Sequence, residues 1–70
     1  MQTKSTSISY RGKQITVTAA QPGPEQETKV ESIGIDGNPV SFEPGDIEPG
    51  DTLEDAIENG IRVATSMVDY

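Results

Sequence analysis

The sequence predicts an α+β fold: a four-stranded antiparallel meander sheet, made of two hairpins, covered on one face by a single C-terminal amphipathic helix. Three observations predict this ββββα fold. Apolar and polar residues alternate in short stretches of the first half, two-residue turns containing Gly separate these stretches, and apolar residues recur at helical spacing after residue 52. The sheet and the helix each have one apolar face, and the two faces are buried when the helix packs on the sheet.

Seventy residues provide one domain. We expect residues 1–6 to be a frayed N-terminus and the strands to lie within 7–42. A Pro/Gly turn linker follows at 43–51, and the helix spans 52–68.

The first predicted hairpin joins Ser7–Tyr10 to Gln14–Ala19, which alternate polar and apolar residues. A two-residue turn at Arg11-Gly12 places Ile8 opposite Ile15. This register brings the apolar residues of both strands to one face of the hairpin. The alternation of apolar residues and the two-residue turn therefore predict the same register. They are Ile8, Tyr10, Ile15, Val17 and Ala19.

The second predicted hairpin joins Lys29–Ile35 to Val40–Phe42 through a turn centred on Asp36-Gly37. Ile33 then faces Val40. Val30 falls on the opposite parity, so it lies either on the back of the sheet or at a position shifted by a bulge.

The linker contains the sequence Glu-Pro-Gly-Asp twice, at 43–46 and at 48–51. Pro followed by Gly is typical of the central positions of a type II turn. We therefore expect two successive turns that hold Ile47 between them.

The predicted helix begins at Thr52, because Thr52 to Asp55 fits the capping-box pattern with Asp in place of Glu. Gly60 costs about 1 kcal/mol relative to Ala inside a helix, and its place in the apolar stripe predicts a close approach to the sheet. The stripe consists of Leu53, Ala56, Ile57, Gly60, Ile61, Ala64, Met67 and Val68.

The composition argues against catalysis. The chain has no Cys, which excludes disulfides and thiolate zinc sites, and no His, the usual general base at neutral pH. No nucleophile or phosphate-loop motif is present. We expect no enzyme activity, no cofactor and no metal site, since turn and helix-start positions account for the acids between Glu43 and Glu58.

The charge is strongly asymmetric. The net charge is −7; residues 1–20 hold three bases and no acid, whereas the remainder holds all twelve acids against Lys29 and Arg62. Direct binding of nucleic acid needs a basic patch, so we do not expect it. The absence of a signal peptide or a long apolar run makes a cytoplasmic protein without membrane contact the default expectation.

Two function hypotheses follow. The first is a small acidic non-enzymatic protein-interaction module, with a weak homodimer as one form. The second is an acidic inhibitor of a basic partner, which includes a nucleic-acid mimic whose helix presents acids in place of phosphates (Glu54, Asp55, Glu58 and Asp69). The candidate interaction surface combines apolar residues beyond the narrow stripe with acids of the helix: Val63, Val68, Tyr70, Glu54, Asp55 and Glu58.

Several of these segments resemble small uncharacterised proteobacterial proteins that begin with Tyr-Arg-Gly. The matching positions are Tyr10-Arg11-Gly12-Lys13-Gln14-Ile15, Ala19, the hairpin from Ile33 to Gly37, Thr52, Ala56, Ala64, Val68 and Asp69. The resemblance implies a bacterial protein with a ββββα fold and no established function. This sequence lacks the tryptophan usual in the third strand of those proteins, and its acidic Pro-rich linker is unusual among them.

A second resemblance is local, to a domain of HicB antitoxins. It rests on Phe42, Pro44, Asp46, Ile47, Pro49, the run Gly50-Asp51-Thr52-Leu53-Glu54-Asp55-Ala56, and Asn59. That family implies binding and blocking of a basic RNA-cleaving toxin. The DNA-binding part usual at the C-terminal end of that family is not found within these residues.

Overall fold

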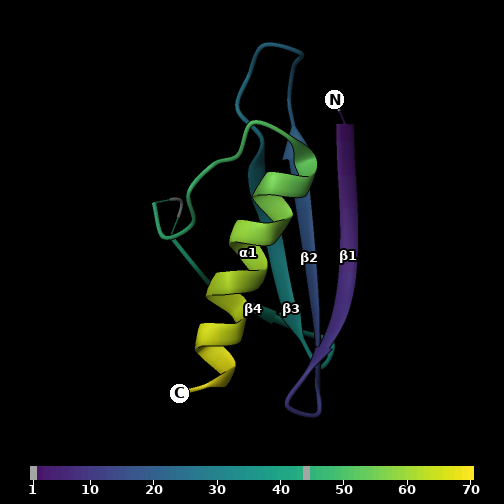
Figure 1. The fold of residues 1–70 in the computed structure, drawn as a ribbon, viewed down its shortest axis with the longest axis vertical. Coiled ribbons are helices and arrows are strands. Elements are labelled where there is room, and N and C mark those ends of the chain that lie inside the picture. Colours follow the sequence, from purple (N-terminus) through teal and green to yellow (C-terminus); the bar gives the residue numbers. More distant parts are fainter. Residues whose placement is uncertain (1, 44) are drawn as a thin grey trace.

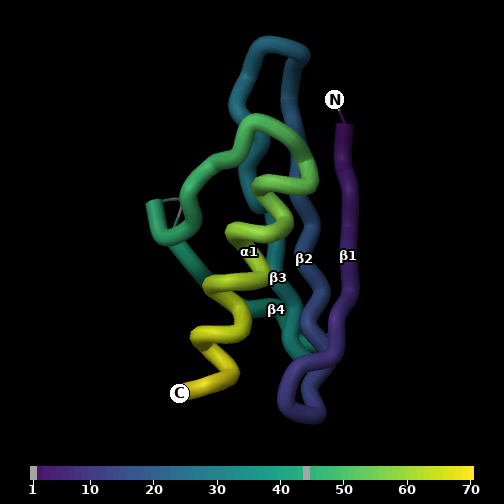
Figure 2. Tube along the Cα trace, viewed as in Figure 1, coloured from purple at the N-terminus to yellow at the C-terminus, as the bar shows by residue number. Residues whose placement is uncertain are grey.

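The computed structural model describes residues 2–43 and 45–70, and it confirms the ββββα fold. The elements are β1 (Gln2–Tyr10), β2 (Lys13–Gln21), β3 (Lys29–Ile35), β4 (Asn38–Val40) and α1 (Leu53–Val68) (Figure 1). The strands form one antiparallel sheet in the order β1-β2-β3-β4. Helix α1 lies on one face of this sheet, against β2 and its neighbours β1 and β3 (Figure 2).

Both predicted hairpin turns are confirmed. Each has a positive φ at its two central residues, 51° and 78° at Arg11-Gly12 and 53° and 82° at Asp36-Gly37. This conformation matches the twist of the adjoining strands. The predicted pairs follow, with Ile8 opposite Ile15 and Ile33 opposite Val40.

The N-terminal strand is longer than expected. Residues 2–6 are not frayed; β1 pairs with β2 as far as Gln2, opposite Gln21. The outer face of this pair is held by hydroxyl groups, such as those of Ser5 and Thr18 at 2.8 Å. The strand forms there with polar side chains on its outer face because one face of an antiparallel sheet can be exposed to water. Met1 lies outside the described residues.

The second hairpin differs from prediction at β4 and settles the position of Val30. The strand expected at Val40–Phe42 is Asn38–Val40 instead: it begins at Asn38 because the two-residue turn places this residue directly opposite Ile35, and it ends at Val40. Of the two alternatives for Val30, the bulge is confirmed. The pairing shifts between Thr18 and Ala19, which leaves Glu31 unpaired and turns Val30 toward α1.

Helix α1 begins and packs as predicted. The Thr52 hydroxyl accepts a hydrogen bond from the Asp55 amide at 3.1 Å, which caps the first turn. The approach at Gly60 is close, since a Cβ added there would lie 2.7 Å from Cγ1 of Val17. The buried core joins helix, sheet and linker: Ile15, Val17, Ala19, Ile33, Ile47, Ala56, Ile57 and Ala64.

The linker before α1 contains one of the two predicted turns. The amide of Asp46 donates to the carbonyl of Glu43 at 3.0 Å, which closes a turn, although the type II conformation expected at Pro44 lies outside the described residues. The second repeat is not a type II turn, because Gly50 does not have a positive φ. Its backbone instead exchanges two hydrogen bonds with Thr28, of 2.9 and 3.1 Å.

Ile47 lies between the two repeats and is buried, as predicted. Burial of this side chain anchors a linker that is otherwise mostly exposed.

Replacing Thr28 by valine is expected to stabilise the protein by about 1 kcal/mol, because the hydroxyl of this fully buried residue has no hydrogen-bond partner in the described part of the chain. Valine has nearly the same shape and removes the unsatisfied group. Urea denaturation measures the change in the free energy of unfolding. Thr28→Ser, which keeps the hydroxyl and loses the methyl group, should be less stable than wild type. A Thr28→Val variant less stable than wild type would contradict this reading.

The bases of the first hairpin form ion pairs within the molecule. Each base of the first hairpin forms an exposed ion pair with an acid from elsewhere in the chain: Lys4 with Glu54 at 3.0 Å, Arg11 with Asp69 at 2.8 Å, and Lys13 with Asp36 at 3.5 Å. Tyr10 also donates its hydroxyl to Asp69 at 2.9 Å. The pairs of Lys4 and Arg11 join the two ends of α1 to β1 and its turn, and exposed ion pairs of this kind contribute little to stability.

These contacts predict acid sensitivity. The pKa of Asp36 is lowered from 3.8, chiefly because the Gln14 amide donates to its Oδ1 at 2.9 Å. The pKa of Glu54 is lowered from 4.5, chiefly by the hydrogen bond from Lys4. A carboxylate with a lowered pKa stabilises the fold above its unfolded-state pKa, and this contribution is lost as the pH falls through the folded-state pKa.

We therefore expect the stability difference between wild type and Asp36→Asn to be constant near neutral pH and to shrink below about pH 4. Asn suits the same turn and keeps an oxygen acceptor for Gln14, so the variant removes mainly the charge. Urea denaturation over a pH series measures the difference. A difference that does not change with pH would contradict the role assigned to the Asp36 carboxylate.

Candidate functional site

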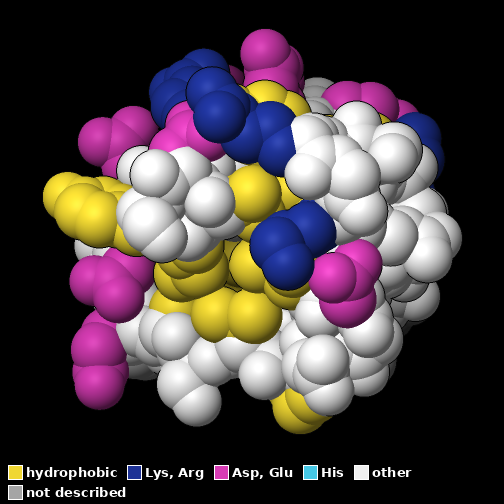
Figure 3. All heavy atoms as spheres, turned by 90° about the horizontal axis from the view of Figure 1, so that it is seen from below, with side chains coloured by type: hydrophobic (Ala, Val, Ile, Leu, Met, Phe, Trp, Pro, Cys, Tyr) yellow, Lys and Arg dark blue, Asp and Glu magenta, His cyan; other side chains and the backbone are white. Residues whose placement is uncertain are grey.

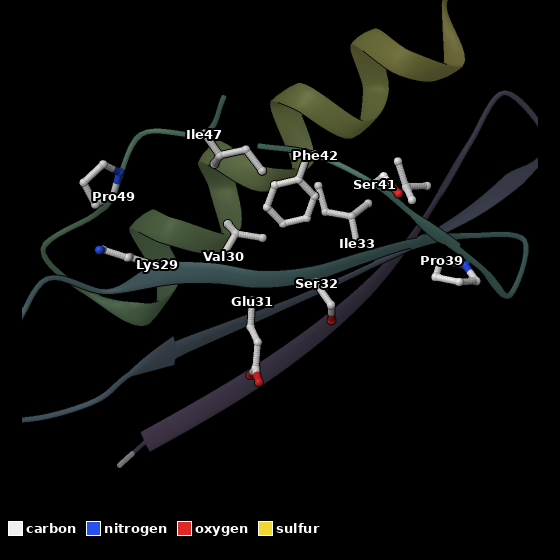
Figure 4. Close-up of a pocket in the computed structure, with 11 residues that line it drawn as sticks. Lys29, Val30, Glu31, Ser32, Ile33, Pro39, Ser41, Phe42, Ile47 and Pro49 are labelled. Atoms are coloured by element: carbon white, nitrogen blue, oxygen red, sulfur yellow. The ribbon is translucent and has the colours of Figure 1, made fainter. Parts of the chain in front are cut away.

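A groove of about 470 Å³ lies at the edge of the sheet, between β3 and the segment that follows β4 (Figure 4). Its walls are mostly apolar and come from the two hairpin strands and the linker. Apolar lining residues include Val30, Ile33, Val40, Phe42, Ile47 and Pro49.

The groove exists because the edge of the sheet is interrupted. β4 follows β3 only as far as Val40, opposite Ile33. The chain then leaves the edge and returns at Gly50, which pairs with Thr28. Between these two points, residues 29–32 of β3 have no neighbouring strand on this side in the described part of the chain. A short length of strand edge is therefore left open, and the bulge in the pairing of β3 with β2 falls in the same interval.

The floor of the groove is preformed by side chains on the α1 side of β3. Figure 4 shows Phe42 and Ile47 beside Val30 and Ile33, whereas Glu31 points away to the other side of the strand. Ile33 and Ile47 are buried in the core, and Phe42 is half-buried. The core therefore fixes the apolar walls in place, while Val30, Val40 and Phe42 keep part of their surface open to solvent.

Three exposed acids, named the rim, stand next in sequence to residues that line the groove. Phe42 is followed by Glu43, and Ile47 stands between Asp46 and Glu48; all three acids are exposed. The ion pairs of the described residues use Glu54, Asp69 and Asp36, and none uses the acids of this rim. On the opposite wall, Lys29 lines the groove, whereas Glu31 points away to the other side of β3 (Figure 4). The three rim acids outnumber this one base, which leaves an excess of negative charge next to the apolar floor.

The six side chains predicted as an interaction surface are not brought together. Val63 and Val68 are half-buried and pack against the core, so they extend the core rather than the exposed surface. Tyr70 is fully exposed at the end of the chain and, with Val63, lines a separate shallow hollow of about 280 Å³. Seen from the end of the molecule where α1 ends, hydrophobic side chains gather in a band that has both basic and acidic side chains beside it (Figure 3).

The acids of the predicted surface also separate. Glu54 is turned to Lys4, whereas Asp55 and Glu58 lie with Arg62 around another hollow of about 280 Å³. Asp69, the fourth acid of the predicted phosphate-like array, is engaged by Arg11. The helix therefore presents a smaller array of free carboxylates than the sequence suggested.

Within residues 2–43 and 45–70, no three carboxylates lie close enough to share a metal ion. In the same part of the chain, α1 is too short and too polar to span a bilayer.

A scan against protein-family models found no match, and neither did searches of curated proteins and of solved structures. The two resemblances noted in the sequence therefore stay predictions. The groove itself was missed from the sequence, where Val30, Phe42 and Ile47 stood only as sheet or linker residues. The sequence signal that could have indicated the groove is Ile47, an apolar residue between two acidic Glu-Pro-Gly-Asp repeats.

Proposed function

We propose that this chain is a non-enzymatic protein-interaction module that binds a partner protein in the groove between β3 and residues 41–49. The observation that carries the proposal is the interrupted sheet edge, which places open strand backbone beside a preformed apolar floor. Extended protein segments bind such edges through backbone hydrogen bonds, and neighbouring apolar pockets take their side chains.

Binding accounts for the groove better than catalysis does. Its polar lining side chains are Lys29, Glu31, Ser32 and Ser41. A serine nucleophile needs a general base beside it, and this chain contains no histidine to serve as one. Ser32, moreover, points away from the apolar floor with Glu31 (Figure 4).

A basic partner is favoured over a second copy of the chain. Two copies, each with a net charge of −7, repel one another. The long free edge of β1 also carries Lys4, which faces α1 and pairs there with Glu54. A charged residue of this kind is a common protection against strand pairing at a sheet edge.

The narrower form of the proposal is an acidic inhibitor of a basic protein. The rim acids favour it because they form no ion pair among the described residues, although the Asp46 carboxylate accepts a hydrogen bond from the Glu43 amide at 3.0 Å. The local resemblance to HicB antitoxins adds support, because it covers the segment from Phe42 to Asn59, which forms the outer wall of the groove and the start of α1.

The proposal is tested by filling the groove. Ser41 is exposed and lines it, so Ser41→Trp should block it with little effect on folding. Peptides selected from a random phage-displayed library on the wild-type chain should bind Ser41→Trp about tenfold more weakly or worse, as measured by isothermal titration calorimetry. Ser9→Trp, on the exposed outer face of β1, is the matched control and should bind like wild type. Equal binding by both variants would overturn the proposal, provided circular dichroism shows both folded.

A further inference from the structure

We infer that the segment accepted by the groove is a short extended stretch of a basic protein, with one large apolar side chain between flanking Lys or Arg residues. This inference rests on the proposed function and specifies the chemistry of the partner.

The apolar anchor follows from the size and lining of the groove. At about 470 Å³, it lies toward the small end of the range of ligand pockets. That volume suits one or two side chains rather than the whole face of a helix. The walls that would contact an anchor are aliphatic and aromatic, from Val30, Val40, Phe42 and Ile47. A Leu, Ile or Phe side chain has complementary chemistry.

The extended, short form of the segment follows from the backbone. Among the described residues, 29–32 of β3 lack a neighbouring strand on this edge, and the gap is closed at one end by Val40 and at the other by Gly50. An added strand could therefore pair over a few residues only and must leave the edge at both ends. Within that length, alternate side chains of an extended segment point toward the floor and away from it.

The flanking bases follow from the rim. Glu43, Asp46 and Glu48 stand next in sequence to the apolar walls, are exposed, and take no part in the ion pairs of the described residues. Three of the five bases of the chain pair with acids elsewhere, so they do not neutralise this rim. Residues on either side of a bound anchor would lie beside these carboxylates. Lys or Arg at those positions gains attraction, whereas Glu or Asp meets repulsion.

A defined peptide library tests the inference. Each peptide has a central Leu, with the flanking positions drawn from Lys, Gln and Glu, and the library is selected on the immobilised full chain. We expect Lys to be enriched over Glu at the flanking positions about tenfold or more at low salt, and less at physiological salt. A Glu43→Lys/Glu48→Lys variant should lose this enrichment. Glu25→Lys/Glu58→Lys makes the same change of net charge at exposed acids that are not next in sequence to any residue lining the groove, and it should keep the enrichment.

The outcomes separate the inference from the proposed function. Peptides that bind in a Ser41→Trp-sensitive manner without a preference for Lys would overturn the inference and leave the docking groove standing. A preference for Lys that Glu25→Lys/Glu58→Lys abolishes equally would overturn it too, because the net charge of the chain would then be the cause. If no peptide binds in a Ser41→Trp-sensitive manner, both fail. Binding of an apolar dye that Ser41→Trp blocks would in that case identify the groove as a small-molecule site.

Discussion

Replacing Gly50 by alanine is expected to lower the free energy of unfolding by about 2–3 kcal/mol. A Cβ at this position would lie 2.6 Å from the amide nitrogen of Ala56 and 2.7 Å from Cβ of Asp55. These atoms belong to the first turn of α1, where the Ala56 amide already donates to the Thr52 carbonyl at 3.1 Å. The added methyl group would therefore clash with helix backbone, which no change of side-chain rotamer can move away. Either the helix start moves or Gly50 leaves its pairing with Thr28.

The same substitution should weaken peptide binding, because the pairing of Gly50 with Thr28 closes one end of the groove. Urea denaturation measures the stability, and calorimetry with a selected peptide measures the binding. Gly23→Ala is the matched control, since a Cβ there meets only Gln26, no closer than 3.7 Å. If Gly50→Ala is as stable as Gly23→Ala, residues 48–51 do not pack against α1 as described.

Replacing Gly60 by valine is expected to cost about 3 kcal/mol. The first carbon of any side chain at this buried position would lie 2.7 Å from Cγ1 of Val17 and 3.0 Å from Cγ2 of Val30. Both neighbours are β-branched and held in the interface between helix and sheet, so neither can rotate away freely. The helix must separate from the sheet, and the gain in helix propensity over glycine is too small to offset this.

A double-mutant cycle isolates the clash. Val17→Ala alone leaves a cavity and should be destabilising. Combined with Gly60→Val it makes room for the new side chain, so the double variant should be about 1–2 kcal/mol more stable than the sum of the single effects predicts. Urea denaturation of the four proteins gives the coupling. Additive effects would mean that the helix does not approach β2 at Gly60.

The hairpins could be predicted because their determinants are local. At Arg11-Gly12 and Asp36-Gly37 the turn residues set the register, and the alternation of the strands agrees with it. The capping residue Thr52 and the stripe through Gly60 set the helix in the same way. In these segments, the pattern that selects the element also selects the face that is buried.

The departures from prediction depend on contacts between distant segments. Residues 2–6 carry no strong apolar pattern, but β2 runs on to Gln21 and offers them a partner. Gly50 was expected in a type II turn, yet it pairs with Thr28, which no local signal indicates. The groove arises from the same long-range closure, and the linker sequence alone does not show which strand lies opposite it.

The charge asymmetry has two roles once the fold is known. The bases of the first hairpin are engaged by Glu54, Asp69 and Asp36, so this part of the asymmetry serves the fold. The acids of the linker are left outside these pairs, and Glu43, Asp46 and Glu48 stand next in sequence to residues that line the groove. Sequence reasoning placed the candidate surface on the helix, because the helix has the clearest pattern, whereas the structure favours the linker.

A titration of the isotopically labelled chain with a selected peptide, followed by amide resonances in NMR spectra, tests the docking groove most directly. Binding there should shift the amides of Val30, Glu31 and Ser32 on the open strand edge, together with those of Phe42 and Ile47. Shifts confined to the free edge of β1, or to the outer face of α1 around Glu58 and Arg62, would contradict it and assign the interaction to another surface.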